Sequence, residues 1–370
     1  MTGIGGCIAL CNLLMDSSCK IHSLDISNND LNNDCIGMLS SALAFHKNTV
    51  KELNIGSQEE FVASSGFKAL SEFLSGSSCM LEKLELVLVG DKCAYFLADL
   101  LVANKTLKHI NFRSSTDVSL GWMIILPCLR GPDSVLVEMN LRNCGIGDQG
   151  AVVLFTKLEK NITLKKLVLS ENRRITPEGW VQSFCILLSS SFSTLEEFSL
   201  DDNNIGDPAA TALIGLLLGR LSGLRSLSLK RNDSVTIFVW SCFGMALQAS
   251  SSSKLRKLHI RTSYVTNSSI NDTIITAFSR ALSKNTRLED LDLGCTNISE
   301  GGWFCLFEAF CDSSSVNNIC YNSNHTLKKM SISRPMDIPH YISTMIFLNS
   351  HKEWVVVAPV KANLYYFSSR

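Results

Sequence analysis

Apolar residues recur along the chain at offsets of 0, 3 and 5 from a series of starting positions. In 195-LEEFSLDDNNIGD-207 they are Leu195, Phe198 and Leu200, and Ile205 follows at offset 10. This spacing fits neither the 3.6-residue period of a helix nor the simple alternation of a strand. The same frame starts at Ile21, Val50, Leu81, Leu107, Leu136, Leu164, Leu195, Leu224, Leu255, Leu288 and Leu327. Eleven starts at a mean spacing of about 31 residues predict an internal repeat.

Each repeat is predicted to begin with a short strand, because the residues at offsets 3 and 5 alternate as on one face of a strand. The residue at offset 8 lies where the chain leaves the strand. An amide there can hydrogen-bond backbone groups of the turn and of the neighbouring coil. The expected structural ladder consists of Asn29, Asn172, Asn203 and Asn232, with Cys144 and Thr296 as weaker substitutes. Val89 and Pro335 take this place in the third and eleventh coils and predict irregular stacking there.

The second half of each repeat is predicted to be helical. In 207-DPAATALIGLLLGRL-221, Asp207 is the expected N-cap and Pro208 the first helical residue. Thr176 and Pro177 are expected to start the preceding helix in the same way. Residues at helical spacing should pack onto the strand leucines: Leu213, Leu217 and Leu221. Because a single strand–helix coil cannot bury its own apolar face, neighbouring coils must stack into a continuous core.

This frame resembles the leucine-rich repeat family, and within it the long-repeat cytosolic subfamily typified by ribonuclease inhibitor. The strand halves that carry the resemblance are 136-LVEMNLRNCGI-146 and 195-LEEFSLDDNNI-205. The helix start 147-GDQGA-151 and the lead-ins 161-NITL-164 and 324-NHTL-327 fit the family as well. The resemblance covers about residues 3–334.

The resemblance implies an α/β fold: a right-handed solenoid bent into a horseshoe, with parallel strands on the concave face and helices on the convex face. It also implies that the protein binds a protein ligand, usually on the concave face. Members of the family include ribonuclease inhibitor, the sensor arrays of NOD-like receptors and the Ran GTPase-activating protein. No residue in this sequence selects one of them.

The predicted array covers residues 1–334, as about eleven coils preceded by a partial repeat helix, and residues 335–370 form a C-terminal cap. Residues 3–15 look like the helical half of a repeat whose strand half is missing. Either this helix caps the array or the chain is a piece of a longer protein, and the second is slightly favoured. The Ser- and Asn-rich segments 262–273 and 311–324 lengthen two coils and are interpreted mainly as surface loops.

Composition narrows the classes of function. Basic and acidic residues balance at 34 each, so no net charge attracts nucleic acid or an anionic membrane. The 14 cysteines include no CxxC pair and indicate reduced, buried thiols in a cytoplasmic protein. No apolar run approaches the ~18 residues of a membrane span. The N-terminal segment also lacks the basic start of a signal peptide.

A search for catalytic chemistry finds no GxxxxGK[ST], GxSxG or HExxH motif, so we expect neither an enzyme nor a cofactor. Asp201 and Asp202 could be catalytic carboxylates, but the frame places them at an exposed strand exit, where a solvated acidic surface is the simpler interpretation. One stretch could supply zinc ligands: Cys305, Cys311, Cys320 and His325. Their irregular spacing favours ordinary thiols instead.

The residues at offsets 2, 4 and 6 are expected to point outward and to form the concave surface. In the seventh to tenth coils this surface is rich in charge, with a basic stripe on coils eight and nine between acidic neighbours. The predicted partner-binding residues are Glu197, Asp201, Arg225, Lys230, Arg231, Arg256, Lys257, His259, Arg261, Asp290 and Asp292. Strands in such an array lie ~4.8 Å apart, so adjacent charges are close neighbours. They therefore either neutralise one another or bind an acidic segment of a protein partner.

The sequence thus favours a non-enzymatic, monomeric scaffold that binds a protein partner on the concave face. Aromatic residues are scarce among the outward positions, which argues against nucleic acid. Two alternatives stay open: a regulator of an enzyme, by GTPase activation or by occlusion, and the sensor array of a larger receptor-like protein.

Overall fold

The computed structural model shows two compact units, Met1–Leu195 and Glu196–Arg370. The structure describes residues 3–29, 31–46, 49–56, 64–76, 79–88, 98–99, 101–114, 121–122, 135–159, 161–189, 194–219, 221, 223–249, 254–262, 272–294, 298–311, 324–332 and 338–351. Thr296, Val89 and Pro335 lie outside these residues, as does the strand-like segment 354–360 expected in the cap. The expectations that depend on them stay predictions.

The first unit alternates short strands with helices. Its elements are α1 (Gly3–Met15), β1 (Ser23–Asp25), α2 (Asn33–Leu43), the 3-10 turn η1 (Ala44–His46), β2 (Glu52–Asn54), α3 (Ser64–Leu74), β3 (Lys83–Leu88), β4 (His109–Ser114), β5 (Glu138–Asn140), α6 (Asp148–Leu158), β6 (Lys166–Val168) and α7 (Pro177–Ser189). Strands β1 to β6 pair in parallel in chain order. The register aligns the residues at offset 3: Leu24, Leu53, Leu84, Ile110, Met139 and Leu167.

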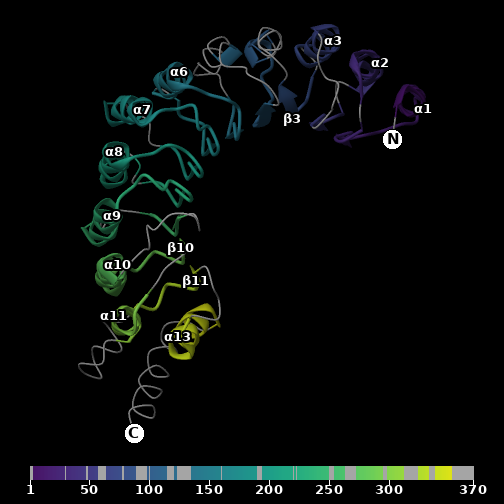
Figure 1. The fold of residues 1–370 in the computed structure, drawn as a ribbon. Coiled ribbons are helices and arrows are strands. Elements are labelled where there is room, and N and C mark those ends of the chain that lie inside the picture. Colours follow the sequence, from purple (N-terminus) through teal and green to yellow (C-terminus); the bar gives the residue numbers. More distant parts are fainter. Residues whose placement is uncertain are drawn as a thin grey trace. The chain divides into compact units, whose positions relative to one another are not determined.

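The second unit continues the alternation. Its elements are β7 (Glu197–Ser199), α8 (Asp207–Leu218), β8 (Ser226–Ser228), α9 (Ile237–Ala249), β9 (Lys257–Thr262), α10 (Asp272–Lys284), β10 (Asp290–Gly294), α11 (Glu300–Phe310), β11 (Lys329–Ile332) and α13 (His340–His351). Strands β7 to β11 again pair in parallel in chain order. In Figure 1 the helices α8 to α11 form one row and the strands of this unit lie on one side of it. The predicted alternation of parallel strands and helices is therefore confirmed.

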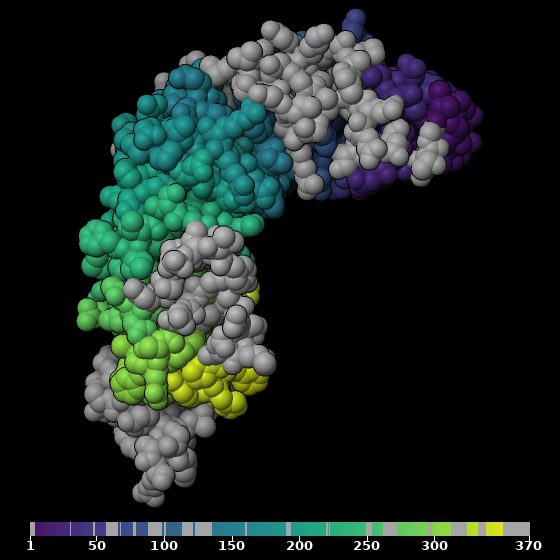
Figure 2. All heavy atoms as spheres, viewed as in Figure 1, coloured from purple at the N-terminus to yellow at the C-terminus, as the bar shows by residue number. Residues whose placement is uncertain are grey.

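The frame residues form the core between the two layers. Leu195, Phe198, Leu200 and Ile205 are all buried. The helical residues expected to face them are buried as well: Leu213, Leu217 and Leu221. Burial of one such leucine stabilises the fold by roughly 1.5–3 kcal/mol, so stacking of coils, not the intrinsic stability of three-residue strands, holds the sheet together. Within the second unit, Figure 2 shows the green atoms of successive coils packed against one another, as this requires.

Aromatic residues join neighbouring helices in the first unit. The rings of Phe155 on α6 and Trp180 on α7 lie edge to face with centroids 6.5 Å apart. Within α7 the centroids of Trp180 and Phe184 are 5.4 Å apart. Aromatic pairs of this kind add about 0.5–1.5 kcal/mol to the free energy of burial.

The residue at offset 8 donates to backbone carbonyls of its own coil, and in Asn172, Asn232 and Cys144 also to a carbonyl of the preceding coil. Asn172 is fully buried, and its Nδ2 donates to Leu141 O at 2.8 Å and Leu169 O at 2.9 Å. Asn232 repeats this pattern with Leu200 O at 2.9 Å. The other described members bond as follows: Cys144 Sγ to Phe112 O at 3.2 Å, Asn203 Nδ2 to Leu200 O at 2.9 Å, and Asn29 Nδ2 to Ser27 O at 3.0 Å.

The start of α8 corrects one prediction. Gly206 is the N-cap of this helix, and Asp207 is its first residue, so Asp207 does not cap its own helix. The Asp207 carboxylate instead accepts hydrogen bonds from Thr236 N at 2.6 Å and Thr236 Oγ1 at 2.8 Å, in the next coil. A carboxylate in the first turn also interacts favourably with the helix dipole. The aspartate therefore serves two coils at once.

This bridge occurs at three helix starts, which makes it a second ladder between coils. Asp148 accepts from Thr176 N at 2.7 Å and Thr176 Oγ1 at 2.9 Å, and Asp272 accepts from the backbone and hydroxyl of Ser299. Thr176 is at the same time the N-cap of α7, since its Oγ1 accepts from Gly179 N at 3.1 Å. The prediction for Thr176 and Pro177 is thus confirmed.

Both ends of the described chain are helical. The helix expected at residues 3–15 is α1, with the bounds Gly3–Met15. At the other end, α13 is tied to the last coil: Asn349 Nδ2 donates to Leu327 O at 2.8 Å, and Ser350 Oγ donates to Lys328 O at 2.7 Å. These bonds occupy backbone carbonyls of the eleventh coil. The division into an array over 1–334 and a cap over 335–370 stays a prediction.

Candidate protein-binding surface

The outward side chains of the second unit lie in straight rows across its strands. The register places the residues at offset 2 side by side, and likewise those at offset 4. The first row is Glu197, Ser226, Lys257, Asp290 and Lys329; the second is Ser199, Ser228, His259, Asp292 and Ser331. We call the surface formed by these rows and the flanking outward residues the strand face.

Most basic side chains of this strand face are paired with an acid of a neighbouring coil. The pairs are Arg225 with Glu196 at 3.4 Å, Arg231 with Asp202 at 3.5 Å, Arg256 with Glu289 at 2.7 Å, and Lys329 with Asp290 at 3.2 Å. The basic partners of these pairs are well exposed, so each pair contributes only about 0–1 kcal/mol to stability. Their main effect is to cancel charge and to restrict the orientation of long side chains.

One ion pair has a more buried carboxylate than the rest. Lys230 Nζ, on the eighth coil, lies 3.1 Å from Asp292 Oδ2 on the tenth. The Asp292 side chain is only 8% exposed, so this pair interacts in a medium of lower dielectric than the surface pairs. Lys230 therefore spans the intervening ninth coil and fixes the charges around His259.

His259, in the middle of this surface, has a lowered pKa. Burial lowers its pKa below the ordinary 6.5, and the Lys230 ammonium lowers it further, against the opposing carboxylates of Asp290 and Asp292. Its Nε2 lies 3.5 Å from Asp290 Oδ1, but the two groups do not have hydrogen-bond geometry. His259 is consequently neutral at pH 7 and adds no positive charge to the basic stripe.

Ser228, His259 and Asp292 lie next to one another on three adjacent strands, which invites comparison with a hydrolytic triad. The geometry does not fit. Ser228 Oγ donates to Asp201 Oδ1 at 2.5 Å, and the acid nearest to His259 is Asp290. A nucleophile of this type needs its hydroxyl on the histidine, so the row lacks the arrangement that activates serine.

Asp201 is half-buried and engaged, which differs from the solvated position expected for it. Besides Ser228 Oγ, its Oδ1 accepts from Lys230 N at 2.8 Å. It therefore links the seventh coil to the eighth. Glu197, at the start of β7, is exposed as expected.

Lys257 differs from the other basic residues of the stripe. Its side chain is exposed, and within the described residues it forms no ion pair. Its neighbours in the row are the neutral Ser226 and Asp290, which interacts with Lys329 and His259. Arg261 is half-buried, and its backbone carbonyl accepts from Arg231 N at 2.6 Å.

A feature of the turns was missed at the sequence level. The residue at offset 7 adopts a left-handed backbone conformation in several coils although it is not glycine: Asn28, Asn143, Glu171, Asp202 and Arg231. Asparagine and aspartate favour this region, whereas Glu171 and Arg231 carry no such signal. In the tenth coil Gly294 has φ +70°, and a Cβ there would lie 2.5 Å from Arg261 Cα, so a side chain is excluded.

The strand face of the first unit is likewise paired. Glu82 lies 3.4 Å from Lys51 and 2.8 Å from Lys108, and Glu138 lies 2.6 Å from Lys166. A polar hollow of about 190 Å³ opens on this face. Its lining residues are Ser27, Asn28, Asn54, Gly56, Glu85, Leu86, Val87 and Asn111. Sequence reasoning did not single out this hollow, because its members come from four coils.

The zinc hypothesis receives no support from the described residues, which contain no group of three or more metal-ligating side chains in reach of one ion. Cys311 is buried, Cys305 is half-buried, and Cys320 lies outside the described residues. Of the helices that the structure describes, none has the length and apolar character needed to cross a membrane.

Comparison with known proteins agrees with the frame. The family described as Leucine Rich repeat matches residues 134–155, 160–180 and 193–213. NACHT, LRR and PYD domains-containing protein 4C of Mus musculus is 29% identical over 194 residues, 52% of this chain and 19% of that protein. NACHT, LRR and PYD domains-containing protein 5 of Mus musculus is 26% identical, and the match covers 81% of this chain and 25% of that protein. Ribonuclease inhibitor of Mus musculus is 27% identical, and the match covers 60% of this chain and 48% of that protein.

Stacked parallel strands with a buried frame of leucines and a ladder of asparagines define a leucine-rich repeat protein, and this chain is one. It is related to the repeat regions of the NACHT, LRR and PYD domains-containing proteins and to ribonuclease inhibitor. The chain spans about a fifth to a half of the length of these relatives.

Proposed function

We propose that this chain is a non-enzymatic interaction scaffold that binds a protein partner on the strand face of its second unit. Leucine-rich repeats are typical of protein-binding scaffolds. The name of one relative, ribonuclease inhibitor, describes a protein that acts on another protein. The absence of a Ser–His hydrogen bond among the described polar residues favours binding over catalysis.

We further propose that an acidic segment of the partner binds around Lys257. The observation that carries this proposal is the pattern of ion pairs. Arg225, Arg231 and Arg256 each lie within 3.5 Å of a carboxylate on an adjacent coil. Lys257 has no such partner among the described residues. A partner carboxylate at Lys257 displaces no internal ion pair, so its full electrostatic attraction contributes to binding. The fixed neighbouring pairs hold the site in one geometry and lower the entropic cost of association.

The test compares three forms of the protein: wild type, Lys257→Glu and the control Arg280→Glu. Arg280 is an exposed residue of α10, so the control makes the same change of charge on the helix side of the unit. Affinity capture from native cell extract at about 50 and 300 mM salt should retain a partner with wild type and control. Lys257→Glu should lose that partner. The higher salt concentration should weaken the binding of the partner to wild type.

Three outcomes distinguish the ideas. A partner lost only with Lys257→Glu supports both the function and the site. A partner held equally by all three forms contradicts the acidic-segment site while supporting a scaffold. A complete lack of specific partners contradicts the scaffold function for this chain by itself.

A single-site change is preferable to simultaneous reversal of the whole basic stripe. Reversing Lys230 would place a second carboxylate beside the buried Asp292 and destabilise the fold, so a loss of binding would have two explanations. Lys257 is exposed, and its replacement leaves the ion pairs of the neighbouring coils in place.

The second candidate function is regulation of an enzyme by occlusion, which similarity to ribonuclease inhibitor favours. If the captured partner is an enzyme, stoichiometric addition of the chain should reduce its turnover, and Lys257→Glu should not. The third is a sensor array within a longer protein, which fits the small share of the NACHT, LRR and PYD relatives that is matched. We propose a cytoplasmic location for each of these functions, because the described cysteines are free thiols.

A further inference from the structure

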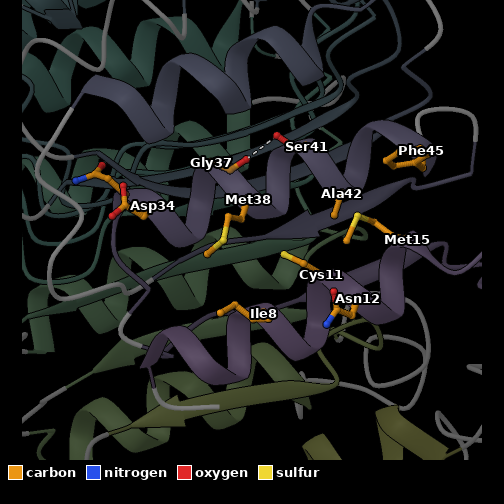
Figure 3. A pocket seen from close by; sticks show the side chains of 11 residues that line it. Ile8, Cys11, Asn12, Met15, Asp34, Gly37, Met38, Ser41, Ala42 and Phe45 are labelled. Atoms are coloured by element: carbon orange, nitrogen blue, oxygen red, sulfur yellow. Dashed lines mark hydrogen bonds between the residues drawn. The ribbon is translucent and has the colours of Figure 1, made fainter.

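A second surface of the first unit, separate from its strands, has the properties of a binding groove. It lies between α1 and α2 and has a volume of about 600 Å³. Its lining residues are Ile8, Cys11, Asn12, Met15, Asn33, Asp34, Gly37, Met38, Ser41, Ala42 and Phe45. In Figure 3 the side chains from the two helices lie along the space between them, with Asp34 at one end and Phe45 at the other.

Three large apolar side chains of the groove are exposed. Ile8 is 45% exposed, Met15 51% and Phe45 73%. Helix α1 carries no charged residue in its 13 positions, while Cys7 and Leu14 on its other side are buried. A helix that is apolar around its whole circumference is typically covered on more than one side, and a contiguous exposed apolar patch marks an interaction site.

The spacing of the lining residues fits a helical occupant. On α1 they lie at i, i+4 and i+7 (Ile8, Asn12 and Met15). On α2 Asp34, Met38 and Ser41 have the same spacing, and Phe45 follows four residues later on η1. The stretch from Asp34 to Phe45 is about 16 Å long at 1.5 Å per residue, which corresponds to about three helical turns. A third helix laid between these two ridges would pack as helices commonly do.

The middle of the groove is kept open by a glycine. A Cβ at Gly37 would have no atom within 4 Å, so the space above this residue is empty. Ser41 Oγ donates to Gly37 O at 3.0 Å, which satisfies the serine inside its own helix and leaves the groove wall largely apolar. An aliphatic side chain of an occupant can therefore reach the helix backbone at this position.

The charge of the groove selects the kind of occupant. Asp34 is the only charged residue in the lining and lies at one end. We propose that this groove binds an amphipathic helix of another protein, with apolar side chains at i, i+4 and i+7 and a Lys or Arg at the end near Asp34. This interaction is independent of the partner on the strand face.

The experiment uses the full chain and a fluorescein-labelled peptide of leucine and lysine, about 14 residues long, with its leucines at helical spacing. The control peptide has the same composition with leucine and lysine alternating. Fluorescence anisotropy measures both against wild type, Gly37→Leu, Gly5→Leu and Asp34→Asn. Gly5, like Gly37, has no atom within 4 Å of a built Cβ but does not line the groove, so Gly5→Leu is the matched control.

We expect the helical peptide to bind wild type and Gly5→Leu equally. Gly37→Leu should weaken it at least about tenfold, because the new side chain occupies the open middle of the groove. Asp34→Asn should weaken it about threefold, the effect of one exposed ion pair, and this difference should vanish at high salt. Circular dichroism checks that each variant folds.

Three results would overturn the proposal: no binding of the helical peptide to wild type, equal binding of the alternating peptide, or equal binding to Gly37→Leu. Sedimentation velocity without peptide provides a separate check. If wild type dimerises and Gly37→Leu is monomeric, a second copy of the chain occupies the groove, and the assignment to another protein is wrong.

Discussion

Replacement of Asn172 tests whether the offset-8 ladder holds adjacent coils together. This side chain is fully buried and makes five bonds to backbone groups. Its Nδ2 donates to Leu141 O at 2.8 Å, Leu169 O at 2.9 Å and Ser170 O at 3.4 Å, and its Oδ1 accepts from Cys144 N and Ile146 N, both at 3.1 Å. In Asn172→Ala all five backbone groups lose this partner at once.

The size of the destabilisation by Asn172→Ala follows from the backbone N–H groups of Cys144 and Ile146. Cys144 and Ile146 are fully buried, so water does not replace the lost acceptor without a rearrangement. An unpaired buried donor costs about 1–3 kcal/mol, whereas a carbonyl with two lone pairs tolerates the loss better. We therefore expect Asn172→Ala to lower the free energy of unfolding by about 3–5 kcal/mol.

A second substitution separates the donor function from the acceptor function. Cys144 occupies the corresponding place in the fifth coil, where its Sγ donates to Phe112 O at 3.2 Å. Asn172→Cys retains a donor but cannot accept from two N–H groups, so we expect an intermediate loss of about 2–3 kcal/mol. Asn12→Ala, at an exposed position of α1, should change stability by less than about 0.5 kcal/mol.

Urea unfolding followed by far-UV circular dichroism measures these differences, compared at equal slope so that a change in cooperativity is not mistaken for a change in stability. A loss below about 1 kcal/mol for Asn172→Ala would refute the reasoning, because it would show that the buried backbone groups find other partners. A loss that is equal for Ala and Cys would assign the whole effect to the two acceptor bonds.

Two further predictions concern pH and helix starts. Because the pKa of His259 is lowered on folding, chiefly by burial, its contribution to stability is complete above the unfolded value of 6.5 and is lost as the pH falls below it. Urea unfolding of wild type between pH 7 and 5.5 should show a fall in the free energy of unfolding, and in His259→Gln this fall should be smaller by the contribution of His259. An equal fall in both proteins would contradict this prediction. A Cβ at Gly179 would lie 2.1 Å from Asp148 Oδ1, so Gly179→Ala should cost about 1–3 kcal/mol by displacing the carboxylate from Thr176. A double-mutant cycle tests this cause: in an Asp148→Ala background, the cost of Gly179→Ala should largely disappear. An unchanged cost in that background would exclude displacement of the Asp148 carboxylate as the cause.

The fold was predictable because its determinants are local. The offsets of Leu195, Phe198 and Leu200 encode a strand and its exit within six residues, and repetition at eleven sites removes the ambiguity of one short apolar run. The start of α7 was predictable for the same reason, since Thr176 and Pro177 act on their own helix.

The role of Asp207 was not predictable from its neighbours in sequence. An aspartate before a proline reads as an N-cap, but Gly206 takes that place and the carboxylate bonds Thr236, 29 residues further on. Only the stacking register brings these groups together. Asp201 is a similar case, because its bond to Ser228 depends on the position of the next coil.

The charges of the candidate site were likewise not predictable from neighbours in sequence. The sequence places basic residues on coils eight and nine correctly but does not reveal which of them are already paired. Lys230 reaches past the ninth coil to Asp292 on the tenth, and burial keeps His259 neutral, so two of the expected positive groups contribute little attraction for a partner. The number of basic residues in a stripe is thus a poor measure of its field when neighbouring coils supply the counter-charges. What matters is the cation left without one, and on the described strand face of the second unit the geometry points to Lys257, a single exposed residue whose removal alone should decide whether the strand face binds an acidic partner.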